Sequence, residues 1–532
     1  MHETESIAYE LASAFASGLT EAASMQAVVA ERGMQSQTYG AGGRPARLGG
    51  RNGMPLLLAR MRSAAGATDA LCVEVAVTET GEYTVTYSGD VPSLPPRVVL
   101  DRAYRFPNHP LPGMARTEAA VTDGRPTDPA IVAEVRVLVD EFIREHTRLH
   151  GSAPVLGSGY TEAEILAAEA RLGARLPEDL RALYRTVHDD SLESGLLAGY
   201  SLASLEKVVE WHRPDDSFEY GPNAGFSGLL DAGLFAYDPV VFETYPHGRV
   251  RRLSRNDRWV MFAPDYGMNY AAVDLDPAPG GAYGQVLKFG RDVHGPAQYI
   301  APSVRHLVHA ALAAMRTAQP GEEWTADRRP RPDHQWSVDL GAADLAAEVA
   351  AHHQPEAVQA VHLRQVDRVR LTDLAGFPNL RSIRMLDVRQ VAEHVDLSIA
   401  AGQPVEQVHI TARSFDPRLL ASAPTVRYLT LGGNSDPVSV AALAELPELV
   451  RLDLADADVA DIASVAGFPA LRVLILDDRQ WNELLATGRV PQQLTGAGLG
   501  GHTSVAQAAA WLTAVQGPDR PACGHRTIRG RL

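Results

Sequence analysis

The stretch YTEAEILAAEARLGARLPEDLRALYRTV, residues 160–187, decides the fold of the middle of the chain. Thr161 and Glu164 have the Thr-x-x-Glu spacing of a capping box, which predicts that a helix begins here. Gly173 is the residue type that commonly ends a helix, and Pro177 is favoured in the first turn of the next one. The stretch therefore predicts two helices joined by a tight bend.

The second predicted helix is amphipathic. Its apolar side chains recur at the i, i+3, i+4 and i+7 positions of one helix face, and they are Leu180, Leu183, Tyr184 and Val187. Further along, residues 258–276 and 284–292 alternate apolar and polar side chains as half-buried strands do. We therefore expect this helix face to pack on strands that include Trp259 and Phe262.

The order of these motifs resembles that of the SUKH superfamily, which includes the fungal Smi/Knr-type cell-wall assembly regulators and many bacterial immunity proteins. The resemblance covers about residues 154–315 and implies an α+β domain. The matching positions are Glu169, Leu176, Pro177, Leu183, Trp259, Phe262, Asp265, Asp274, Asp276, Pro302 and Ser303. In one departure, residues 188–190 are His-Asp-Asp where many members carry an Asn-Gly-Gly turn.

The motif Pro-x-Leu-x-x-Leu-x-Leu recurs in the C-terminal third of the chain. The prolines are Pro378, Pro424, Pro447 and Pro469, with one gap of 46 residues followed by gaps of 23 and 22. Degenerate units at 358–363 and 405–410 extend the series. This period resembles the leucine-rich repeat, and the resemblance implies an α/β solenoid over residues 337–490.

The remaining segments complete a multidomain α+β chain. Residues 1–150 read as a small α+β domain of unknown role, with a helical pattern through Val29, a β-hairpin at 70–90 and a closing helix from Pro129. The polar, proline-containing residues 316–335 read as a linker. Residues 491–532 read as a capping helix and a flexible tail.

Composition narrows the class of protein. The net charge of −16 makes nucleic acid an unlikely partner. No run of eighteen apolar residues occurs, so we expect no membrane span, and the N-terminus lacks the pattern of a signal peptide. Cys72 and Cys523 are the only cysteines, which favours a cytoplasmic protein without a disulfide framework or a thiolate zinc site.

No residue set in the sequence makes a convincing catalytic site. Asp265, Asp274 and Asp276 would suit a divalent ion, but aspartate is also favoured at turns and strand ends. His188 beside Asp189 would suit a polarised base, or an ordinary surface loop. We therefore expect no cofactor, no metal and no enzymatic activity.

The repeat strands carry the most specific binding prediction. In Leu-x-x-Leu-x-Leu the residues between the leucines point to the opposite face of the strand. That face would carry the candidate binding residues Arg381, Arg384, Arg427, Tyr428, Arg451 and Arg472. Arginine and tyrosine are enriched at protein interfaces, so we predict a site for acidic protein surfaces; the alternative is an ordinary solvated face.

These observations predict a non-catalytic protein that binds protein partners. The resemblance to bacterial members implies immunity against a toxin, neutralised by direct binding. A regulatory scaffold that binds several proteins is the alternative implied by the fungal members. An enzyme built on the N-terminal domain is the third possibility.

Overall fold

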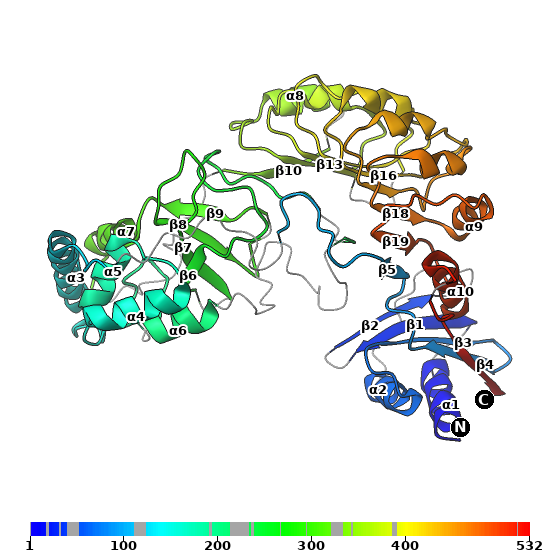
Figure 1. Cartoon of the computed structure of the whole chain (residues 1–532), viewed down its shortest axis with the longest axis horizontal. Coiled ribbons are helices and arrows are strands. Elements are labelled where there is room, and N and C mark those ends of the chain that lie inside the picture. Colours follow the sequence, from blue (N-terminus) through cyan, green and yellow to red (C-terminus); the bar gives the residue numbers. More distant parts are fainter. Residues whose placement is uncertain are drawn as a thin grey trace.

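The chain folds into several domains of mixed helices and sheets, shown in a computed structural model (Figure 1). The structure describes residues 2–17, 21–30, 33–39, 53–110, 124–190, 194–212, 234–235, 239–265, 268–293, 295–320, 334–341, 344–385, 391–518 and 520–532. Residues 321–333 of the predicted linker therefore lie outside the described residues.

The N-terminal domain is built on a five-stranded antiparallel sheet in the order β2-β1-β3-β4-β20. The strands are β1 (Ala23–Ala30), β2 (Gly33–Tyr39), β3 (Leu71–Val77), β4 (Glu82–Ser88) and β20 (Arg526–Arg531). Helices α1 (His2–Ala16) and α2 (Met54–Ala65) share a core with one face. The opposite face, with Val28 and Cys72, joins the core that contains α10 (Val505–Gln516).

Two predictions for the chain ends are wrong. The helical pattern through Val29 stops at Ala16, because the Ala- and Val-rich stretch that follows alternates between two cores and pairs as a strand on both sides. The C-terminal tail is not loose, because Arg526–Arg531 covers the edge of β4. The hairpin predicted at 70–90 is confirmed as β3 and β4.

The middle domain packs five helices with a four-stranded antiparallel sheet in the order β6-β7-β8-β9. The strands are β6 (Trp259–Pro264), β7 (Asn269–Asp274), β8 (Gln285–Gly290) and β9 (Gln298–Ala301). The helices are α3 (Pro129–His150), α4 (Glu162–Leu172), α5 (Glu178–Thr186), α6 (Leu205–Trp211) and α7 (Val304–Thr317). The predicted capping box of Thr161 and Glu164 and the left-handed Gly173 cap are both present on α4.

The boundary between the first two domains differs from the expected one at residue 150. Helix α3 carries an apolar stripe that includes Val135, Val139 and Phe142, and this stripe lies in the core of the middle domain. An amphipathic helix buries such a stripe against another element. Helix α3 packs against α5 and α7. The middle domain therefore begins before α3.

The predicted packing of the second helix is confirmed for Phe262. Leu180, Leu183 and Tyr184 are buried in one core with Phe262 of β6. Trp259 lies on the same strand but belongs to a separate cluster with Leu287 on β8.

We expect Leu183→Ala to destabilise the middle domain by about 2–5 kcal/mol, because it leaves a cavity in this core. Val137→Ala, at a side chain that is 61% exposed on α3, is the control and should cost less than about 0.5 kcal/mol. Denaturant unfolding monitored by hydrogen–deuterium exchange in β7 measures both. Equal stability of the two variants would contradict the placement of Leu183.

The C-terminal region forms eight parallel strands in chain order, and β5 (Arg97–Val99) adds antiparallel to the last. The parallel strands are β10 (Ser337–Leu340), β11 (Ala360–Leu363), β13 (Ser382–Met385), β15 (Gln407–Thr411), β16 (Tyr428–Gly432), β17 (Arg451–Asp453), β18 (Val473–Leu476) and β19 (Gly496–Leu499). The register aligns Val361, Ile383, Val408, Leu429, Leu452 and Leu474. All six predicted strand positions therefore pair, while β10 and β19 extend the sheet beyond them.

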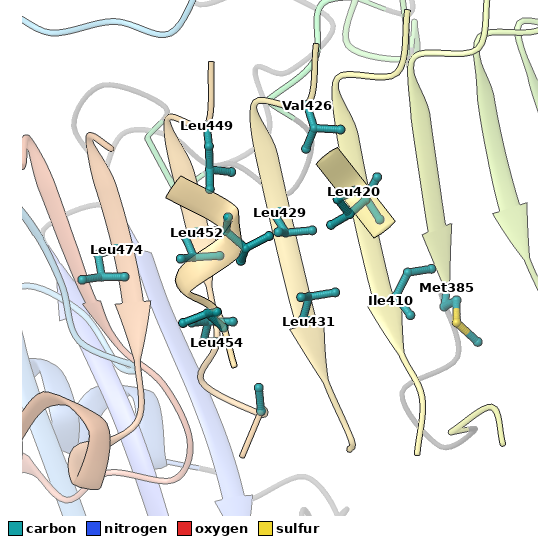
Figure 2. Packing of buried hydrophobic residues seen from close by; sticks show 14 of the residues in the cluster. Met385, Ile410, Leu420, Val426, Leu429, Leu431, Leu449, Leu452, Leu454 and Leu474 are labelled. Atoms are coloured by element: carbon teal, nitrogen blue, oxygen red, sulfur yellow. The ribbon is translucent and has the colours of Figure 1, made fainter. Parts of the chain in front are cut away.

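One face of this sheet, the outer face, packs against short helices. Figure 2 shows Leu429, Leu431, Leu452 and Leu454 in the buried cluster with Leu420. The helices are α8 (Leu345–Ala350), η5 (Leu371–Leu374), η6 (Pro417–Ser422), η7 (Ala441–Glu445), η8 (Ile462–Gly467) and α9 (Asp478–Ala486). A small pair of strands, β12 (Arg368–Arg370) and β14 (His394–Asp396), lies in the connections. We call the opposite face of the parallel sheet the inner face.

Candidate interaction surfaces

The inner face is covered by two segments of the same chain, residues 104–109 and 239–252. An apolar cluster joins Phe106 and Phe242 of these segments to Ala360, Tyr428 and Val473 of the sheet. The rings of Phe106 and Tyr428 meet edge to face with centroids 5.0 Å apart. The predicted binding face is therefore in part an interface within the molecule.

An ion-pair network extends this contact. The Arg381 guanidinium lies 2.8 Å from the Glu406 carboxylate of the sheet and 3.3 Å from the Glu243 carboxylate of the covering segment. Arg252 of the same segment pairs with Glu406 at 2.7 Å. The buried Glu406 carboxylate therefore joins Arg252 of the covering segment to Arg381 beside the sheet.

The side chain of Gln359 joins the sheet to the main chain of the covering segment. The Gln359 side chain is fully buried, its Nε2 donates to the Glu243 carbonyl at 2.7 Å, and its Oε1 accepts from the Glu243 N–H at 2.8 Å. One amide side chain thus satisfies both main-chain groups of Glu243. His247 adds a contact between its Nε2 and the Glu356 carbonyl at 2.9 Å.

The candidate binding residues do not all face solvent. Tyr428 and Arg384 are buried, so the expected exposure of these two is wrong. The Arg384 Nη2 donates to the His362 Nε2 at 2.7 Å. Arg472 lies over the Tyr104 ring, with 6.0 Å to the centroid.

The remaining candidate arginines also lie close to carboxylates. Arg427 pairs with Glu448 at 2.5 Å, and the Asp453 carboxyl is subject to the charge of Arg451. Together with the pairing of Arg381, these contacts place a carboxylate beside three of the candidate arginines. Whether the face binds a separate partner stays a prediction.

Sequence reasoning did not identify Glu243 or Arg252 as part of this surface. Their partners Gln359 and Glu406 lie 116 and 154 residues away along the chain. Segment 239–252 carries no repeat and no helix or strand of its own, so no local signal pointed to it.

A histidine on the inner face gives the surface a pH dependence. Burial, and then the charges of Arg384 and Arg451, lower the pKa of His409 to about 4, while Asp456 opposes this shift. A histidine in an unfolded chain titrates near about 6.5. Between these two values the unfolded chain binds more protons than the folded chain, so stability falls as the pH falls.

We therefore expect His409→Gln to lose less stability than the parent between pH 7 and pH 5. The glutamine keeps a polar side chain but takes up no proton in this window. Denaturant midpoints of both proteins at the two pH values test this. Identical losses would show that His409 does not titrate as described.

The middle domain holds a fully buried ion pair. The Arg181 Nη1 donates to both carboxylate oxygens of Glu169, at 2.7 and 2.6 Å, and neither side chain is exposed. Glu162 also pairs with Arg181, and the Arg181 Nε donates to the Thr127 hydroxyl at 3.1 Å. The Leu176 N–H donates to Glu169 at 2.8 Å. The network therefore joins α4 and α5 to the residues that precede α3.

Of the three aspartates weighed as a metal site, Asp274 and Asp276 are neighbours, and Asp265 lies apart from them. Asp265 accepts hydrogen bonds from Asn269 at one end of the β6–β7 hairpin, whereas Asp274 ends β7 opposite Trp259. Asp274 accepts from the Asp276 N–H at 3.0 Å, and burial raises its pKa to about 6. Across the described ranges, no group of three or more His, Cys, Asp or Glu side chains is placed to hold a metal ion.

The side chains of the His-Asp-Asp stretch contact neighbouring groups of the middle domain. The Asp190 carboxylate is buried and accepts from the Ser194 and Leu196 N–H groups at 2.8 and 3.3 Å. The His188 ring stacks on Tyr160 with centroids 4.5 Å apart, and its Nδ1 lies 2.8 Å from the Asp189 carboxylate. This geometry orients a half-exposed imidazole at the edge of the middle domain.

Comparison with known proteins assigns the middle domain. Residues 159–308 match the SMI1 / KNR4 family (SUKH-1), so this part of the chain is a SUKH domain, as predicted. The cell wall biosynthesis/cell cycle regulator smi1 of Schizosaccharomyces pombe is 32% identical over 143 residues, which cover 25% of this chain and 27% of the relative.

Two further relatives match a similar share of the chain. The glucan synthesis regulatory protein of Neurospora crassa is 26% identical over 167 residues, covering 26% of this chain and 30% of the relative. The cell wall assembly regulator SMI1 of Saccharomyces cerevisiae is 26% identical over 155 residues, covering 25% and 30%. The chain thus spans less than a third of the length of these curated relatives. In the part of the chain that the structure describes, no helix has the length and apolar character needed to cross a membrane.

Proposed function

We propose that this protein is a non-catalytic regulator that acts by binding other proteins. The observation that carries the proposal is the SUKH domain at 159–308, whose relatives are named as regulators of the fungal cell wall and of glucan synthesis. These names favour the regulatory alternative over immunity against a toxin. An immunity protein would be encoded beside a toxin gene, so the neighbouring genes discriminate between the two.

The side chains weighed for catalysis support a binding role. Asp265 and Asp274 stabilise a turn and a strand end, and His188 is held by Tyr160 and Asp189 at a surface. Each of these groups has a structural partner, and they lie in separate parts of the domain. We infer that the chain recruits partners and does not transform a substrate.

We further propose that the parallel sheet is a solenoid of leucine-rich-repeat type. Each predicted unit contributes one strand to a parallel sheet, and short helices return along the outer face. Asn434 bridges two units, because its Nδ2 donates to the Asp458 carbonyl at 2.7 Å and its Oδ1 accepts from the Asp458 N–H at 3.0 Å. Solenoids of this kind present extended binding surfaces.

Affinity purification of the tagged full chain from its source cells, with quantitative mass spectrometry, tests the regulatory proposal. We expect a reproducible set of proteins that cross-link to residues 124–320. A chain from which 124–320 is deleted should lose this set while keeping its remaining domains. A set that the deletion leaves unchanged would contradict the proposed role of the SUKH domain.

A further inference from the structure

The contact between residues 239–252 and the inner face has the features of ligand recognition. Residues 239–244 form no helix and no strand, yet Val241 and Phe242 are buried. Phe242 packs against Trp336, with ring centroids 4.7 Å apart, and shares a cluster with Ala360 of the sheet. The aromatic side chain thus occupies an apolar site formed by the first strands of the sheet.

The next residue supplies the polar half of the contact. Gln359 holds both main-chain groups of Glu243, as the edge of a sheet holds an added strand. The Glu243 carboxylate lies 3.3 Å from the Arg381 guanidinium and accepts from the Gly248 N–H at 2.9 Å. Main-chain recognition by Gln359 is independent of sequence, whereas Arg381 selects a carboxylate.

The covering segment is also anchored away from the sheet, where the Thr244 hydroxyl donates to the Ala297 carbonyl at 2.6 Å. The Arg249 carbonyl accepts from the Ala278 N–H at 3.0 Å and from the Gln285 side chain at 2.8 Å, which ties 249 to the SUKH domain. Toward the sheet, the segment is held by side chains and not by a ladder of main-chain bonds. Such a contact can open without unfolding either domain.

We propose that the inner face is a recognition groove for an extended protein segment with an aromatic residue followed by a carboxylate. Residues 241–244 occupy this groove as an internal competitor. The inference deepens the proposed function, because it names the class of partner that would compete for the groove. A partner with this pattern would release the SUKH domain from the sheet.

Because residues 241–244 belong to the same chain as the groove, the groove should be open in only a small fraction of molecules. A segment joined to the same chain competes at an effective concentration in the millimolar range. The apparent affinity of an outside segment is reduced by the small fraction of molecules that are open. Weakening the internal copy while leaving Gln359 and Arg381 intact should therefore raise the affinity for an added peptide.

The test uses a fluorescent peptide with the sequence PVVFETYPHG, residues 239–248, and the full-length protein. Anisotropy titrations compare the parent with the double variant Phe242→Ala/Glu243→Ala. We expect the double variant to bind the peptide at least about tenfold more tightly. Adding Gln359→Ala to the double variant should remove this gain, and a peptide with both FE residues replaced by alanine should not bind.

A second variant, Glu243→Gln, covers the case in which the double variant does not fold. It removes only the charge that Arg381 holds, and it should also raise peptide affinity over the parent. No gain in a folded variant, or equal binding of the alanine peptide, would overturn the proposal. Either result would leave the regulatory proposal intact, because the peptide experiment needs no cellular partner.

Discussion

Glu169→Ala should destabilise the middle domain by about 3–5 kcal/mol, because it leaves the Arg181 guanidinium buried without its main counter-charge. Both side chains of the pair are fully buried, and Arg181 places two hydrogen bonds on Glu169. The Leu176 N–H would also lose its acceptor. The effect should therefore exceed that of losing a surface ion pair.

Two further variants make the comparison specific. Glu169→Gln keeps the shape and one acceptor oxygen, so it should cost less than alanine but more than a surface change. Arg291→Ala removes the ion pair between Arg291 and Asp292 on the surface. The Arg291 side chain is 67% exposed, and such pairs contribute less than about 1 kcal/mol. Denaturant unfolding of the middle domain measures all three. A Glu169→Ala protein as stable as Arg291→Ala would show that the pair is not closed in solution.

Trp481→Ala should destabilise the parallel sheet by about 3–5 kcal/mol. Trp481 of α9 is fully buried, and its Nε1 donates to the Gly498 carbonyl of β19 at 2.8 Å. Its ring also meets Trp511 of α10 edge to face, with centroids 5.8 Å apart. One side chain therefore joins the last strand to both flanking helices.

Trp481→Phe separates packing from hydrogen bonding. Phenylalanine fills most of the site but leaves the Gly498 carbonyl without this donor, which should cost about 1–3 kcal/mol. Hydrogen–deuterium exchange in β18 and β19 localises the effect within the sheet. Exchange that is equally slow in the alanine variant and the parent would contradict the role given to Trp481.

Local signals explain what the sequence could predict. The capping box at Thr161, the glycine stop at Gly173 and the apolar spacing through Leu183 act within one or two helix turns, so the helix pair is correct. The six repeat strands could be predicted because the Leu-x-x-Leu-x-Leu motif recurs at a regular spacing in the sequence. Their pairing in register needs only that neighbouring units stack.

The errors come from contacts between residues far apart in the chain. Ala23–Ala30 is a strand because partners on both sides override an ambiguous local pattern, and Arg526–Arg531 is a strand because β4 needs an edge partner. Similarly, Glu243 meets Gln359 only after two domains have folded. The sequence identified the arginine-bearing face, but the segment that covers it could not be read from spacing.

Residues 239–252 close the inner face of the parallel sheet. Hydrogen–deuterium exchange of the Glu243 N–H, which Gln359 accepts at 2.8 Å, tests this closure directly. We predict slow exchange in the parent, fast exchange in Gln359→Ala, and slow exchange in the control Gln493→Ala. Gln493 also binds main-chain groups through its side-chain amide, which donates to the Phe468 and Pro469 carbonyls. A Glu243 N–H that exchanges in the parent as fast as in the free peptide would show that the segment does not close this face.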